Sequence, residues 1–244
     1  MIEPYYQTDL GTLYCGDWLE VMKQLPDNTA DLLITDPPYF QPAVHYCPPR
    51  GHKPQKRQIS DMSIFKHFMR MFFDECSRVI KSTGSYYIFC DGQSYSAMFE
   101  GLFLYVNRVR PLVWDKLTSV NGYTWRHQHE LIAWGEGFDA ERVNTGDGDI
   151  LKCKAVPVNE RKHPAEKPIK LISRLIEKHN PECVLDPFGG SSTVALACVP
   201  LHVKWIIIEL AEDYCAISKD RIEKEAQQLK LFPGSGGGVR HEMR

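Results

Sequence analysis

Residues 32–40 (LLITDPPYF) place a carboxylate, two prolines and an aromatic ring directly after a run of aliphatic residues. The prolines fix the local φ angles and carry no N–H, so the Pro37 carbonyl and the Asp36 carboxylate form a pair of acceptors. Such a pair suits an –NH2 group, and Tyr39 could stack on the ring that bears it. Asp36, Pro37, Pro38 and Tyr39 are therefore candidate catalytic residues. A simple strand exit is the alternative, because an acid before prolines is common in turns.

A second stretch, residues 184–198 (VLDPFGGSSTVALAC), runs from an apolar strand through a glycine turn to small residues that open a helix. Glycines let a backbone approach a ligand closely, and a helix N-terminus favours anions. An acid at the end of the next apolar run could accept hydrogen bonds from ribose hydroxyls. The unit predicts a nucleoside-cofactor site, with a purely structural corner as the alternative. The candidate residues are Asp186, Pro187, Phe188, Gly189, Gly190, Ser191, Ser192, Thr193 and Glu209.

The elements that must position these residues alternate between strands and helices. Residues 30–36 form a continuous apolar run, which is typical of a central parallel strand, and residues 62–81 carry apolar side chains on one helical stripe. The pattern predicts an α/β fold: a doubly wound Rossmann-like sheet, mostly parallel with an antiparallel strand near one edge, and helices on both faces. Pro111 favours an edge or bulged strand at residues 108–116. Both motifs follow predicted strands, and such sheets bind ligands at the carboxyl ends of their strands, so one shared site is expected.

The length of 244 residues allows one large domain or two small ones. We place one catalytic domain at residues 1–232 of the 244, and a flexible Gly-rich tail at 233–244. The eight cysteines contain no CxxC pair, which favours the reduced thiols of a cytoplasmic protein. There is no apolar run of roughly 20 residues, no secretory signal and no zinc-finger spacing. We therefore expect neither a membrane partner nor a metal.

Two segments outside the regular pattern are candidate recognition loops, residues 41–60 and 136–160. The first is longer than a routine connection and has a basic centre without acids, and the second is Gly- and Asp-rich without periodicity. The net charge of −2 gives no global basic field, so solvated loops are the alternative to a DNA-binding surface. The candidate DNA-binding residues are Arg50, Lys53, Lys56 and Arg57, and Arg126 in the stretch 121–130.

The motifs resemble those of a known family. TDPPY at residues 35–39 resembles the catalytic motif of the S-adenosylmethionine-dependent DNA amino-methyltransferases, and DPFGGSST at 186–193 resembles their cofactor motif D-P-F-x-G-x-G-T. Residues 13–39, 163–176 and 206–222 are also similar to family segments, in the permuted order called the beta class. Ser191 and Ser192 depart from the pattern, which often has Gly after a small residue. We expect weaker packing there rather than loss of binding.

The resemblance implies transfer of a methyl group from S-adenosylmethionine to the exocyclic N6 of an adenine flipped out of double-stranded DNA. Asp36 and the Pro37 carbonyl would localise the amine lone pair and stabilise its developing charge, while Tyr39 would replace lost stacking. It also implies that Asp17 lies near the adenine of the cofactor and Lys167 near its methionine end.

Several alternatives stay open at this point. Cytosine N4 presents the same two hydrogens as adenine N6, although the aspartate form of the motif favours adenine. RNA or protein-glutamine methylation is less favoured, since those relatives usually carry Asn in place of Asp36. A catalytically idle DNA-binding or partner subunit, and a nicotinamide dehydrogenase, are candidates from other classes. A second copy of the chain and a restriction endonuclease are candidate partners. The expected localisation is the cytoplasm of a prokaryote, and the gene could belong to the host or to a phage.

Overall fold

A mixed sheet forms the centre of the protein. The computed structural model describes residues 2–41, 59–118, 124–141 and 146–231. In these residues the strands are β1 (Tyr6–Gln7), β2 (Gly11–Cys15), β3 (Ala30–Thr35), β4 (Ile80–Cys90), β5 (Arg108–Asp115), β6 (His129–Glu136), β7 (Ile150–Lys152), β8 (Cys183–Asp186) and β9 (Lys204–Glu209). Their order across the sheet is β1-β2-β9-β8-β3-β4-β6-β5-β7.

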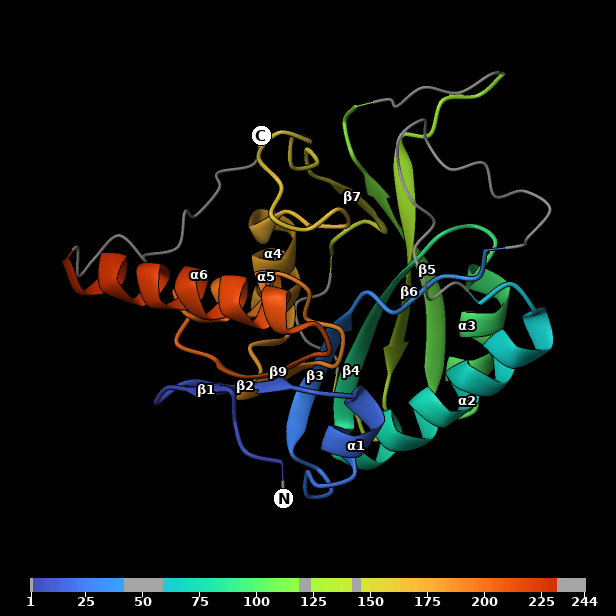
Figure 1. Ribbon diagram of the computed structural model, residues 1–244. Helices are drawn as coiled ribbons and strands as arrows, with labels where there is room; N and C mark the ends of the chain where they lie inside the picture. Colours follow the sequence, from blue (N-terminus) through green and yellow to red (C-terminus); the bar gives the residue numbers. More distant parts are fainter. Residues whose placement is uncertain (1, 42–58, 119–123, 142–145, 232–244) are drawn as a thin grey trace.

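Helices cover both faces of the sheet, as predicted (Figure 1). One face carries α1 (Trp18–Met22), α2 (Met62–Val79) and α3 (Tyr95–Phe103), and the other carries α4 (Ile169–His179), α5 (Thr193–Cys198) and α6 (Glu212–Leu231). Each layer has its own apolar core against the sheet. The longest helix of the first layer shows why: α2 buries Phe65, Met69, Phe72 and Cys76, which recur every three or four residues along one stripe.

The strand directions confirm the predicted sheet. The strands β2, β9, β8, β3 and β4 run parallel, whereas β6 is antiparallel to both β4 and β5. At the opposite edge the sequence missed β1, a strand of two residues that pairs antiparallel with β2. Pro111 pairs with Ala133 of β6 and precedes the β7 pairing, which begins at Val113. The outer side of β5 is therefore a local edge at Pro111, where its missing N–H is tolerated.

The two predicted recognition loops have different outcomes. Within residues 136–160 the expectation of a loop is wrong at β7, which pairs in parallel with β5. Three residues are too few to show a period in the sequence. Residues 42–58, with Arg50, Lys53, Lys56 and Arg57, lie outside the described residues, as does the tail 233–244. The flanks of the first loop meet, because Gln41 donates its backbone N–H to the Ile59 carbonyl at 3.0 Å.

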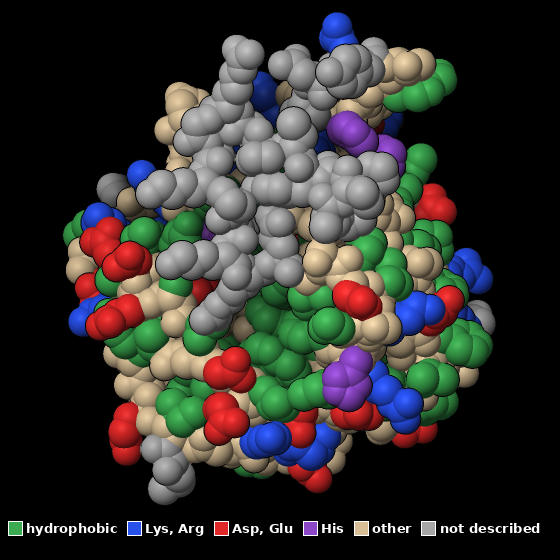
Figure 2. Space-filling model, turned by 45° about the vertical axis from the view of Figure 1, so that its right-hand side comes forward, with side chains coloured by type: hydrophobic (Ala, Val, Ile, Leu, Met, Phe, Trp, Pro, Cys, Tyr) green, Lys and Arg blue, Asp and Glu red, His purple; other side chains and the backbone are tan. Residues whose placement is uncertain are grey.

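The surface in Figure 2 has a hollow near its centre, lined by hydrophobic side chains. On the described part of this face, acidic and basic side chains are interspersed rather than gathered by sign. None of the helices in the described ranges has the length and apolar character that crossing a membrane requires.

Candidate active site

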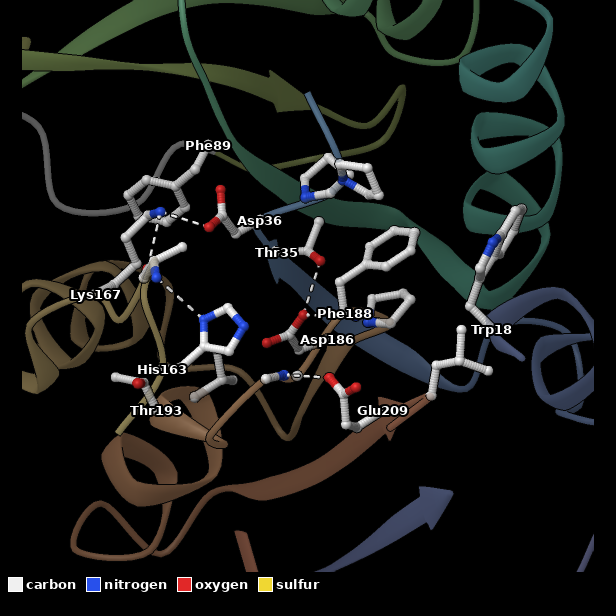
Figure 3. A pocket seen from close by; sticks show the side chains of 18 of the residues that line it. Trp18, Thr35, Asp36, Phe89, His163, Lys167, Asp186, Phe188, Thr193 and Glu209 are labelled. Carbon is white, nitrogen blue, oxygen red and sulfur yellow. Dashed lines mark hydrogen bonds and ion pairs between the residues drawn. The ribbon is translucent and has the colours of Figure 1, made fainter. Parts of the chain in front are cut away.

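A cavity of about 640 Å³ lies at the carboxyl ends of β3, β8 and β9 (Figure 3). Its volume is within the usual range for small-molecule and cofactor sites. Every predicted catalytic residue lines it, and so does every predicted cofactor residue except Ser192. The two motifs, 150 residues apart in the sequence, are therefore brought together as the strand positions predicted.

The catalytic corner follows the last residue of β3. The Asp36 carboxylate accepts a hydrogen bond from the Tyr39 hydroxyl on Oδ1, and it forms an ion pair of 2.6 Å from Oδ2 to Lys167 Nζ. Burial, followed by the charge of Asp36, raises the pKa of Tyr39 well above its ordinary value, so the phenol stays protonated and donates. The sequence predicted acceptors at this corner. In the structure, both carboxylate oxygens of Asp36 already have donors.

A buried charge network continues behind Asp36. Lys167 is 7% exposed and lies 3.4 Å from Glu130 Oε2, while Lys116 Nζ lies 2.6 Å from Glu130 Oε1. Burial alone lowers the pKa of Lys167, but Asp36 and Glu130 outweigh it, so this pKa is raised and the ammonium stays charged. Burial raises the pKa of Glu130, and the two lysines reverse that effect, so its net pKa is lowered.

This arrangement places the Lys167 ammonium on the predicted catalytic carboxylate, whereas the resemblance implied a position near the methionine end of a cofactor. The ammonium also lies 5.0 Å from the centre of the Phe89 ring. Sequence reasoning missed Glu130 and Lys116, because nothing in their local sequence marks them. They reach the site only because β6 and β5 pair beside β4.

The cofactor corner begins with a buried acid, Asp186, which forms no ion pair with any residue that the structure describes. Asp186 Oδ1 accepts hydrogen bonds from Thr35 Oγ1 at 2.8 Å and from the Phe188 N–H at 3.1 Å. Burial raises the pKa of Asp186 to about 7, against the lowering effect of these two donors. The Thr35 contact joins the two corners directly, since Thr35 immediately precedes Asp36.

The glycine turn is fixed by packing and by an acid. A Cβ on Gly189 would lie 2.1 Å from Ile207 Cγ2 of β9, and Gly190 has a φ of +52°. Glu209, at the end of β9, accepts from the Gly190 N–H through Oε2 at 2.8 Å and from the Ala211 N–H through Oε1 at 2.7 Å. The sequence predicted glycines for close approach to a ligand, and the structure adds a packing reason for Gly189. Glu209 lines the cavity as predicted while also holding the turn.

The two serines that depart from the family pattern are both buried. Ser192 adopts a φ of +60°, in the left-handed region that favours glycine, and it precedes α5. Its hydroxyl and that of Ser191 have no hydrogen-bond partner among the described atoms. Ser192 therefore combines a left-handed backbone conformation with an unpaired hydroxyl, and the weaker packing expected at these two serines stays a prediction.

An aromatic wall closes one side of the cavity. The ring of Trp18 lies 5.8 Å from Phe68 and 6.0 Å from Phe188, centre to centre, and this side suits a flat heterocycle. The predicted residue Asp17 lines the same side, and its carboxylate caps α1 by accepting from the Leu19 N–H at 2.9 Å. Sequence reasoning assigned Trp18 and Phe68 to packing alone.

A histidine on the opposite side was also missed. The His163 ring lies over Gly190 and packs against Tyr214, with ring centres 4.6 Å apart. Burial lowers its pKa, so the imidazole is neutral at pH 7. Its signal was present in the sequence, because His163 opens one of the segments that resemble the family.

The remaining predictions concern surfaces. Arg126 is exposed, beside the 86% exposed Trp125 in the connection from β5 to β6, and it does not line the cavity. In the part of the chain that the structure describes, no group of three or more His, Cys, Asp or Glu side chains is arranged to hold a metal ion.

Comparison with known proteins defines the class. The DNA methylase family of the N6 and N4 type matches residues 30–220. The chain belongs to this family, the S-adenosylmethionine-dependent DNA amino-methyltransferases, as the motifs predicted.

The sequence identity to individual members of the family is low. The chain is 28% identical to the type II methyltransferase M.BamHI of Bacillus amyloliquefaciens over 95% of its own length, but it spans only 61% of that protein. It is 26% identical to the type II methyltransferase M2.MboI of Moraxella bovis, over 94% of each chain. Among solved structures, the fold is similar to the cytosine-N4-specific PvuII DNA methyltransferase, with a TM-score of 0.72, 18% identity and coverage of 92% of this chain and 93% of that one. A complex of M1.HpyAVI with S-adenosylmethionine gives a TM-score of 0.66 at 22% identity, covering 87% of this chain and 98% of that one.

Proposed function

We propose that this chain transfers the methyl group of S-adenosylmethionine to the exocyclic amine of a base in double-stranded DNA, with adenine N6 as the acceptor and cytosine N4 as the alternative. The observation that carries the proposal is the position of Asp36. Its carboxylate lies in the same cavity as the cofactor corner and is joined to it by the Thr35–Asp186 hydrogen bond. Methyl acceptor and donor would thus meet over adjacent strand ends.

The residues of the cavity fit the cofactor. The aromatic wall of Trp18, Phe68 and Phe188 offers apolar faces for a purine, and the Glu209 carboxylate offers acceptors for ribose hydroxyls. When bound, the sulfonium supplies an already electrophilic methyl group. The carboxylates of Asp36 and Glu209 favour a cationic ligand in this cavity, and among the described residues that line it, Lys167 supplies the one basic side chain apart from the neutral His163.

The chain's own residues would act mainly by orientation. Asp36 and the Pro37 carbonyl accept the two amine hydrogens, which localises the nitrogen lone pair and stabilises the positive charge that develops there. The methylated ammonium is strongly acidic, so no powerful base is required. A base inside a duplex is out of reach, so it must be flipped into the cavity, and Tyr39 would stack on it. Asp36 in the motif favours adenine over cytosine.

The setting of the reaction belongs to the same proposal. The bacterial relatives are named type II methyltransferases, which supports action in a bacterial cytoplasm within a restriction–modification system that has a separate endonuclease. A second copy of the chain would extend the short recognition region. Residues 41–60 and 136–160, together with Arg126, are proposed to contact the DNA.

The test begins with the purified chain, S-adenosylmethionine and unmethylated genomic DNA. The DNA is digested to nucleosides and the methylated products are identified by mass spectrometry. N6-methyladenine is the expected product, and N4-methylcytosine would keep the mechanism while changing the base. No methylated nucleoside from a chain that binds S-adenosylhomocysteine in a thermal-shift assay would overturn the proposal in favour of an idle or partner-dependent subunit.

A further inference from the structure

The carboxylate that is proposed to receive the target amine is already occupied in this structure. Tyr39 donates to Asp36 Oδ1. The Lys167 ammonium lies 2.6 Å from Oδ2 (Figure 3). A neutral amine is a weaker partner for a carboxylate than an ammonium at this distance, because only the ammonium adds a charge–charge attraction to the hydrogen bond. The target amine therefore has to compete with Lys167 for Asp36.

A second place for the ammonium lies close by. Glu130 Oε2 is buried and forms no hydrogen bond within the described structure, yet it lies only 3.4 Å from Lys167 Nζ. The other oxygen of Glu130 is held at 2.6 Å by Lys116, which fixes the position of the carboxylate. An approach of about 0.6 Å would bring Lys167 within charge-assisted hydrogen-bond distance of Oε2.

We propose that Lys167 is a gating residue whose ammonium moves from Asp36 to Glu130 when the target base enters, and that Glu130 is a positioning residue which receives it. This inference rests on the proposed function. In the empty cavity Lys167 neutralises Asp36, and in the loaded cavity it pairs with Glu130 and leaves Asp36 Oδ2 to the amine. The network holds two carboxylates and two ammonium groups in either arrangement, so the shift leaves no unbalanced buried charge.

The chemistry of methyl transfer explains why the Lys167 ammonium would have to move. As the carbon–nitrogen bond forms and the carbon–sulfur bond breaks, positive charge develops on the acceptor nitrogen beside Asp36. An ammonium that remained 2.6 Å from the same carboxylate would repel that charge and weaken the stabilisation that Asp36 provides. Deprotonation of Lys167 would also remove this repulsion, but burial, which lowers the pKa of Lys167, is outweighed by Asp36 and Glu130, which raise it. The ammonium therefore stays charged.

The first test compares Glu130→Gln with a matched variant on α2, Glu75→Gln. Glu75 forms an ion pair of 2.8 Å with Arg78, its side chain is 19% exposed against 21% for Glu130, and it does not line the cavity. Glu130→Gln is expected to lower kcat at least tenfold, with KM for S-adenosylmethionine and for DNA unchanged within twofold, whereas Glu75→Gln changes none of them. Equal kcat values for the two variants would overturn the proposal.

The second test asks whether Lys167 causes the defect. With the ammonium removed in Lys167→Met, adding Glu130→Gln should change kcat by less than twofold, and Lys167→Met alone should retain more activity than Glu130→Gln alone. If Lys167→Met is the less active single variant, the ammonium assists transfer on Asp36 and the gate is refuted. Cofactor thermal shifts identify folded variants. If Glu130→Gln does not fold, Lys167→Met is compared with the wild-type chain alone: a kcat within tenfold of wild type supports the gate, and a larger loss refutes it. Failure of the wild-type chain to methylate DNA would refute the proposed function instead.

Discussion

The two corners of the cavity are built on different physical principles, although each follows a parallel strand. The catalytic corner after β3 is held by charged side chains: Asp36 has an ammonium at 2.6 Å, which in turn faces Glu130. The cofactor corner after β8 is held mainly by contacts to the backbone: Phe188 donates its N–H to Asp186, Gly190 donates its N–H to Glu209, and Gly189 packs directly against Ile207. Charged side chains at the first corner are therefore expected to be separable from the fold, whereas changes at the second should disturb fold and binding together.

The largest expected effect tests that separation at the catalytic corner. Asp36→Ala should reduce methyl transfer below detection, because the acceptor for the amine is lost, while Lys167 keeps Glu130 as its counterion. Binding of S-adenosylhomocysteine, measured by calorimetry, should stay within about threefold of wild type. Full activity in this variant would remove the amine-orienting role, and loss of cofactor binding would mean that the two corners are not separable.

The next prediction concerns Asp186, the buried acid of the cofactor corner. The pKa of Asp186 rises from 3.8 to about 7 on folding, so between these values the folded chain holds a proton that the unfolded chain releases. Stability should therefore fall as the pH rises through this window, by about 4 kcal/mol in total at about 1.4 kcal/mol per pH unit. Asp186→Asn removes the dependence while retaining an acceptor oxygen. In urea unfolding at pH 4.5 and 8, the free energy of unfolding of the variant should rise relative to that of wild type as the pH rises. A constant difference between the two proteins would contradict a buried carboxyl with a raised pKa.

A steric change should then disturb the cofactor corner as a whole. Gly189→Ala inserts a Cβ that would meet Ile207 Cγ2 at 2.1 Å, and we expect a loss of about 3 kcal/mol in the free energy of unfolding, together with weaker cofactor binding. Gly16→Ala is the matched control in the same cavity, because its Cβ would meet Val21 at an ordinary 3.6 Å. If the free energy of unfolding of Gly189→Ala equals that of the control, β9 must shift to accommodate the new Cβ at little cost.

The smallest effect is a gain. Ser192→Gly should raise the free energy of unfolding by about 1 kcal/mol, because it relieves a φ of +60° and removes a buried, unpaired hydroxyl. Ser191→Gly is the control, since Ser191 has an unpaired hydroxyl without a positive φ. A Ser192→Gly variant that binds S-adenosylhomocysteine more weakly than wild type would indicate that the serine hydroxyl serves the cofactor site.

The parts of the fold that the sequence predicted are those with long local patterns. The stripe of α2 and the continuous apolar run of β3 each identify one element by themselves. The strands β1 and β7 were missed because two or three residues show no period, and they form only by pairing with longer strands. Prediction therefore succeeded where the information is local.

In the candidate site, too, the sequence predicted the contiguous motifs but not their remote partners. Asp36–Tyr39 and Asp186–Thr193 are contiguous motifs, so residue type and strand ends were enough to place them in one cavity. The partners of these motifs are remote: Lys167 lies 131 residues from Asp36, and Thr35 lies 151 residues from Asp186. Which remote side chain meets which carboxylate depends on the order of strands in the sheet, and no local pattern carries that order.

The reversed direction of β6 has a consequence for how this protein could change its DNA target. A parallel strand delivers its last residues to the ligand-binding edge, but β6 delivers its first, so Glu130 stands there as the second residue of the strand. Its register is fixed by pairs that run from Asp115–His129 to Arg108–Glu136, with a further Lys116–Gln128 backbone bond of 2.8 Å. If the connection beyond that bond contacts DNA, as proposed for Arg126, the site does not depend on its sequence. The length and composition of the connection can drift, or be exchanged by grafting, while the charge behind Asp36 keeps its place.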